Sequence, residues 1–136
     1  MPEPEIAKFY PKYEPPGRIL AICAGDQAGG PKKDVGQGQL TRNLGLNGDA
    51  DALKRVLWLL AEEDYLSLKA QNPVLAYGAT GENLVVSLSL ASLAPGRRLR
   101  SGDALIELGA REGPRLFRSK VVLDGIITVG DQIYAE

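Results

Sequence analysis

The stretch YGATGENLVV, residues 77–86, joins a glycine-rich segment to an apolar run with the composition of a strand. Gly78 and Gly81 bracket the segment, and glycine adopts positive φ angles without steric cost. Glu82 and Asn83 stand directly before the apolar run. Two interpretations are open: a tight turn stabilised by the Asn83 side chain, or the edge of a binding cleft where glycines let a ligand approach the backbone. Taken alone, the stretch favours the turn.

The sequence after this stretch predicts short strands separated by turns. Residues 84–88 form one apolar strand, and residues 97–108 contain two strand-like runs around a Ser-Gly-Asp turn, the pattern of a β-hairpin. Residues 121–129 contain two further runs around Asp124-Gly125, which predicts a second hairpin with a type I′ turn. Many short strands with such turns predict a mostly β fold that closes, or nearly closes, into a barrel.

The N-terminal half predicts one principal helix among strands and loops. Residues 18–24 read as a buried strand, and residues 25–39 as a glycine-rich loop. The apolar run 56–60 is compatible with a central strand or the start of a helix. Acidic residues at 62–64 suit a helix N-terminus, and Asn72-Pro73 ends the element.

Length and proline content predict the domain organisation. A chain of 136 residues fits a single domain with one core. Residues 1–16 are expected to form a proline-rich arm, because each proline lacks a backbone donor and disfavours helix at the residue before it. Tyr10 and Tyr13 could pin this arm onto the domain. Residues 17–136 are expected to form the barrel domain.

Composition excludes several classes of function. The chain has no histidine, which rules out Ser-His-Asp and Cys-His nucleophile pairs and removes the commonest zinc ligand. The formal net charge of −1 argues against nucleic-acid binding. No apolar run reaches the roughly 20 residues that span a bilayer, so no membrane partner and a cytoplasmic location are expected. One cysteine precludes an intramolecular disulfide.

The remaining reactive or charged residues have ordinary structural explanations. Cys23 lies in an apolar strand, which predicts a buried thiol without reactivity. The Gly-Asp pairs lack the spacing of an EF-hand loop and are predicted to be turns, with no metal site. Interspersed acids predict solvated cross-strand pairs for most of the arginines of the C-terminal third, which are Arg97, Arg98, Arg100, Arg111, Arg115 and Arg118.

Several segments, taken in order, resemble the MOSC domain family, named after the C-terminal domain of molybdenum cofactor sulfurase. Residues 78–84 match the family pattern Gly-Ala-x-Gly-Glu-Asn-Leu throughout, and residues 45–52 resemble its Gly-Leu-x-Gly-Asp-x-His-Ala turn. The resemblance extends from about residue 17 to the C-terminus. The other segments that carry it are 17–22, 59–63, 95–103 and 129–133.

The resemblance implies a MOSC-type β-barrel whose cleft handles sulfur or the molybdenum cofactor through a reactive cysteine that follows a proline. Here Arg115 stands in the place of that cysteine, after Pro114, and Asp51 replaces the histidine of the turn. A guanidinium stays protonated and has no acceptor, so it cannot hold a persulfide or a soft metal. We therefore expect the family fold without the family's cysteine chemistry and assign no catalytic residue.

The expected function is binding of an anionic ligand in the barrel cleft. Gly81, Glu82 and Asn83 are predicted to shape the cleft, and Arg111 and Arg115 to offer charge-assisted bonds to the anion. The resemblance suggests the molybdenum cofactor or pyridoxal phosphate as the ligand, and a cysteine desulfurase or molybdoenzyme as a partner. Two alternatives stay open: a sulfur carrier or transferase that uses Cys23 or a partner's thiol, and a degenerate subunit that docks on such a partner. Whether the protein is an enzyme is left undecided.

Overall fold

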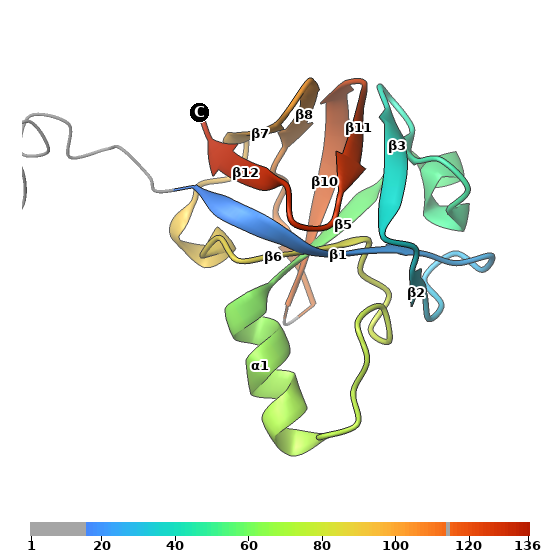
Figure 1. The fold of residues 1–136 in the computed structure, drawn as a ribbon, viewed down its shortest axis with the longest axis vertical. Helices are drawn as coiled ribbons and strands as arrows, with labels where there is room; N and C mark the ends of the chain where they lie inside the picture. Colours follow the sequence, from blue (N-terminus) through green and yellow to red (C-terminus); the bar gives the residue numbers. More distant parts are fainter. Residues whose placement is uncertain (1–15, 114) are drawn as a thin grey trace, which may run out of the picture.

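A computed structural model describes residues 16–113 and 115–136, and the N-terminal arm predicted from the sequence lies almost wholly outside them. Seven strands pair into a closed barrel in the order β12–β7–β8–β10–β5–β6–β1, and β1 pairs back with β12 (Figure 1). Neighbours are antiparallel except β5 and β6, which are parallel. The barrel strands are β1 (Gly17–Ala24), β5 (Leu57–Ala61), β6 (Leu84–Val86), β7 (Arg98–Ser101), β8 (Ala104–Glu107), β10 (Leu116–Leu123) and β12 (Gln132–Ala135). The mostly β prediction is confirmed.

Shorter elements extend the barrel at its edges. A three-stranded sheet, in the order β11–β3–β4, stands beside it, while β2 pairs with β1 and β9 with β10. Two 3₁₀ helices, η2 (Ala50–Lys54) and η3 (Leu90–Ser92), complete the described elements. The bounds of the edge strands are β2 (Lys33–Asp34), β3 (Gln37–Thr41), β4 (Gly45–Leu46), β9 (Arg111–Glu112) and β11 (Gly125–Thr128).

The C-terminal hairpin expected around Asp124-Gly125 is not formed, and that prediction was wrong. Strand β11 begins at Gly125 but pairs with β3 instead of folding back on β10. The Asp124 carboxylate accepts a hydrogen bond from the Arg42 backbone N–H at 2.6 Å, which ties this corner to the turn after β3. The hairpin of β7 and β8 is present as predicted.

The principal helix, α1 (Glu62–Gln71), projects from one end of the barrel, as Figure 1 shows. It begins with three acidic residues and ends before Pro73, as the sequence predicts. Tyr65 is its one buried residue; its hydroxyl donates to the Leu75 carbonyl at 2.7 Å, and its ring lies 4.5 Å from that of Tyr77. The helix is therefore attached to the barrel mainly through its first half and the loop that follows.

The core has two parts. The main cluster fills the barrel with aliphatic side chains from every barrel strand, and members such as Leu59 and Ile106 are fully buried. A smaller cluster lies between the sheet and α1, and it contains Cys23, Leu60 and Tyr65. The run 56–60, for which the sequence left two alternatives, is largely the buried central strand β5. No helix in the described part of the chain is long and apolar enough to cross a membrane.

Candidate functional site

The segment that precedes β6 is a turn held by a buried carboxylate. Gly78 and Gly81 have φ angles of +90° and +92°, and the Gly81 N–H donates to the Gly78 carbonyl at 3.0 Å. The Glu82 carboxylate accepts from the Gly78 N–H at 2.9 Å and from the Thr80 hydroxyl at 2.7 Å. Glu82 is 1% exposed, so it stabilises the turn from inside and does not present its oxygens to solvent.

Asn83 is also buried, and it joins three strands or loops. Its Oδ1 accepts from the Trp58 N–H at 2.9 Å, and its Nδ2 donates to the Cys23 carbonyl at 3.1 Å. The sequence suggested that this amide stabilises the turn itself; in the structure Glu82 does so, and Asn83 connects β5 to β1. The position is buried because strands β1 and β5 flank β6 on both sides.

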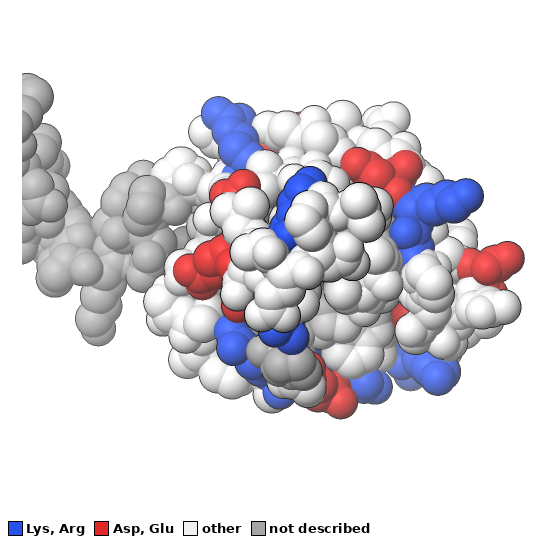
Figure 2. Space-filling view, turned by 90° about the horizontal axis from the view of Figure 1, so that it is seen from below, with Lys and Arg blue, Asp and Glu red and all other residues white. Residues whose placement is uncertain are grey.

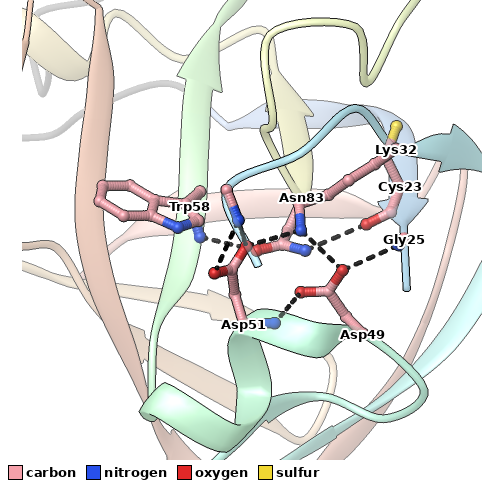
Figure 3. Close-up of polar contacts among 8 residues, drawn as sticks. Cys23, Gly25, Lys32, Asp49, Asp51, Trp58 and Asn83 are labelled. Atoms are coloured by element: carbon pink, nitrogen blue, oxygen red, sulfur yellow. Dashed lines mark hydrogen bonds and ion pairs between the residues drawn. The ribbon is translucent and has the colours of Figure 1, made fainter. Parts of the chain in front are cut away.

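A charged network unforeseen from the sequence lies beside Asn83 (Figure 3). The Lys32 ammonium contacts Asp49 Oδ1 at 2.8 Å and Asp51 Oδ2 at 2.7 Å, and all three side chains are at most 4% exposed. Backbone N–H groups of Gly25 and Gly29 donate to the same carboxylates. Asp51, which the sequence resemblance placed at a histidine position, is thus one of two acceptors for a buried lysine.

The network shifts the pKa values of its members in the directions expected for a buried ion pair. Burial alone would raise the pKa of Asp49, but hydrogen bonds from Lys32, Asn83 and the Gly25 backbone hold it below the ordinary value. Burial alone would lower the pKa of Lys32, but its two carboxylate partners raise it above the ordinary value. Both charges are therefore retained at neutral pH, and the network fixes the loop between β1 and β2 onto η2.

Cys23 is fully buried, as predicted from its apolar strand. Burial first, and then the carboxylates of Glu82 and Asp34, raise the pKa of its thiol to about 12. In Figure 3 its sulfur points away from the Lys32–Asp49–Asp51 contacts. A reactive thiolate needs a lowered pKa and access to solvent, and Cys23 has neither.

A cavity of about 260 Å³ lies between α1, the 78–81 turn and the β9–β10 hairpin. Thr80 and Arg115 both line it, so the structure brings to one cavity the turn and the arginine that the sequence resemblance placed at a cysteine position. Arg115 is half-buried, and within residues 16–113 and 115–136 no carboxylate forms an ion pair with it. The remaining lining residues are Leu68, Glu112, Gly113 and Leu116.

Arg111 lies on the same hairpin but is not a lining residue of this cavity. Its guanidinium contacts the Asp64 carboxylate of α1 at 3.4 Å and lies 4.9 Å from the centre of the Phe117 ring. Arg111 therefore links the β9–β10 hairpin to α1, two of the walls of the cavity. Ligand contact by Arg111 stays a prediction.

The five residues predicted for the cleft thus have different positions. Arg115 lines the cavity, Glu82 and Asn83 are buried behind the turn that forms one wall, and Gly81 allows the turn itself. Thr80 was not predicted, although it lies inside the quoted motif. Figure 2 looks onto the end of the molecule that carries α1, where acidic and basic side chains are interspersed. Among the described residues no group of three His, Cys, Asp or Glu side chains is placed to hold a metal ion.

No family model matches the sequence, and no curated protein matches it either. Solved structures do match the fold. YiiM from Geobacillus stearothermophilus superposes with a TM-score of 0.70 at 15% identity, over 89% of this chain and 75% of YiiM. YiiM from Escherichia coli gives a TM-score of 0.67 at 21% identity, over 90% of this chain and 70% of that protein.

YuaD from Bacillus subtilis superposes with a TM-score of 0.72 at 16% identity, and the match covers 90% of this chain and 97% of YuaD. YiiM and YuaD are MOSC-domain proteins. At these identities the likeness is one of fold. The fold of this chain is therefore MOSC-like.

Proposed function

We propose that this MOSC-like domain binds a small anionic ligand in the cavity beside Arg115 and performs no chemistry through a cysteine. The observation that carries the proposal is Arg115, a partly buried residue that lines a cavity and has no ion-pair partner in the described part of the chain. Partly buried arginines are usually paired, because removing a charge from water costs free energy. A bound carboxylate or phosphate would supply the missing partner.

The surroundings of Arg115 suit such a ligand. A guanidinium donates two parallel hydrogen bonds to a carboxylate or phosphate, and the partial exclusion of water strengthens these bonds. Leu68 and Leu116 supply apolar walls for the rest of the molecule. Glu82 and Asn83 support the site without lining it. Glu82 holds the 78–81 turn, and Asn83 links β5 to β1 beside that turn.

The cofactors suggested by the resemblance fit only in part. A phosphate group, which the molybdenum cofactor and pyridoxal phosphate both carry, matches the hydrogen-bond donors of Arg115 and is small enough to enter the cavity. A molybdenum ion would need soft or anionic ligands, and the lining residues offer Glu112 alone. Within this proposal the chain recognises the anionic part of such a cofactor, and the cofactor supplies any chemistry.

Calorimetric titration with pyridoxine 5′-phosphate tests the proposal, since this probe has no aldehyde that could react with lysines. We expect saturable binding that Arg115→Gln weakens about tenfold to a hundredfold, the equivalent of 1.5–3 kcal/mol for hydrogen bonds to a charged group. Arg42→Gln is the matched control, because Arg42 is exposed and follows β3, which ends on the opposite side of the barrel from α1 (Figure 1). Equal affinities for the two variants would refute the proposal.

A docking function has one observation in its favour. Helix α1 projects from the barrel, and Leu66 on the helix and Val74 after it are 55% and 88% exposed. A cysteine desulfurase or molybdoenzyme could cover these side chains. Co-purification with such an enzyme that Leu66→Ser abolishes and Arg115→Gln leaves unchanged would favour docking over ligand capture.

A further inference from the structure

The polar side chains that line the Arg115 cavity include both hydrogen-bond donors and hydrogen-bond acceptors. Arg115 can only donate hydrogen bonds. Thr80 has one hydroxyl proton, and the structure directs it to the buried Glu82 carboxylate at 2.7 Å. The oxygen of Thr80, a lining residue of the cavity, is therefore left with acceptor capacity alone.

Glu112 is a second acceptor in the same lining. Its carboxylate contacts the Arg118 guanidinium at 3.5 Å, a long ion pair between two side chains that are each 50% exposed. Exposed pairs of this kind contribute little free energy, and a carboxylate can accept about four hydrogen bonds. Glu112 consequently keeps capacity for hydrogen bonds from a ligand.

From this division we infer that the cavity is selective for amphoteric ligands, molecules that carry an anionic group for Arg115 and an amino or ammonium group for Thr80 and Glu112. The inference rests on the proposed function and adds the class of ligand. An anion without N–H or O–H donors would satisfy Arg115. It would also displace the water that donates hydrogen bonds to Thr80 and Glu112 without replacing those bonds, and this loss lowers affinity.

The size of the cavity adds a limit. Its volume of about 260 Å³ corresponds to about nine water molecules at 30 Å³ each. Pockets for drug-sized ligands begin at about 300 Å³. The ligand, or the part of it that enters, is therefore a compact group such as one substituted ring or one amino acid, with its body against Leu68 and Leu116.

The test compares two probes of nearly equal size, pyridoxamine 5′-phosphate and 4-deoxypyridoxine 5′-phosphate, which differ by an aminomethyl group in place of a methyl group. Dissociation constants are measured by calorimetry for the full-length protein and its variants. We expect the amino compound to bind about tenfold more tightly, equivalent to about 1.4 kcal/mol. The ratio of the two constants, rather than either affinity, is the readout, because a general loss of structure would weaken both probes.

Three variants locate the selectivity. Thr80→Val and Glu112→Gln should each bring the ratio towards one, while Thr80→Ser, which keeps the hydroxyl, should retain it. Both positions are exposed. Because Thr80→Val also removes a hydrogen bond to the buried Glu82 carboxylate, the ratio of the two constants is compared and not the affinity for either probe. Equal binding of the two probes to the unmodified protein would overturn the inference and leave anion binding intact. Failure of both probes to bind would overturn the proposed function as well.

Discussion

Replacing Lys32 with methionine would leave Asp49 and Asp51 buried without the cation they share. The three side chains are at most 4% exposed, so solvent cannot compensate the two carboxylates. Removing one partner of a buried ion pair typically costs 3–5 kcal/mol. Since single domains are stable by only about 5–15 kcal/mol, Lys32→Met should remove a large part of the stability of this protein.

Urea unfolding followed by the fluorescence of Trp58, the one tryptophan of the chain, measures this loss. The matched control is Lys120→Met, which breaks an exposed ion pair with Glu107 at 3.2 Å and should cost at most about 1 kcal/mol. For a domain of this size, a loss of 3–5 kcal/mol also lowers the melting temperature by roughly 10–20 °C.

The pH dependence gives the prediction a second, independent signature. The pKa of Asp49 is lowered by its partners, so its contribution to stability is present above the ordinary value of 3.8 and is lost as pH falls through the lower folded value. The pKa of Lys32 is raised, so its contribution is present below 10.5 and is lost only above that pH. The deficit of Lys32→Met should thus be largest near neutral pH and shrink towards pH 4, where the unpaired Asp49 carboxylate takes up a proton. A deficit equal to that of Lys120→Met, or one independent of pH, would refute this explanation.

Further predictions concern the turn and the thiol. Gly78→Ala should destabilise the protein by at least about 2 kcal/mol more than Gly96→Ala in the same unfolding assay. Both glycines have φ angles near +90°, but only at Gly78 would an added Cβ collide with the Lys32 carbonyl oxygen. Similar losses of stability for the two variants would show that the turn can move away from Lys32. Iodoacetamide should alkylate Cys23 in the folded protein only at the rate of unfolding, since with a pKa of about 12 roughly one thiol in ten thousand is ionised at pH 8. Rapid alkylation without denaturant would contradict the burial of this residue and revive the sulfur-carrier alternative.

Local sequence signals predicted much of the barrel. Strand β1, helix α1 and the β7–β8 hairpin follow from an apolar run, an acidic start with a proline stop, and a Ser-Gly-Asp turn, all of which act within a few residues. Strand β3 was missed because its sequence, QGQLT, looks like part of a glycine-rich loop. It is a strand because it lies between β11 and β4, and such pairing has no local signature.

Non-local contacts also explain what the sequence could not predict about the site. Lys32 stands in a Gly-Pro loop where a lysine is ordinarily solvated, and its partners are 17 and 19 residues further along the chain. Asp49 and Asp51 could be recognised in the Gly-Asp turn, but nothing in the sequence around them predicted that they bind a buried lysine. Arg115 could be singled out because it replaces a cysteine in a recognisable pattern, whereas Thr80 became significant only when its hydroxyl bond to Glu82 was seen.

The most direct test of ligand capture by Arg115 is NMR titration of the isotope-labelled protein with pyridoxamine 5′-phosphate. The guanidinium Nε–Hε signals report on arginine side chains, and the backbone amides report on the walls of the cavity. We predict saturable shifts of the Arg115 side-chain signal together with amides of residues 78–82, 111–113 and 115–118, while the Arg42 signal stays unchanged. Shifts confined to other parts of the protein, or no shift at millimolar probe, would contradict binding at this cavity.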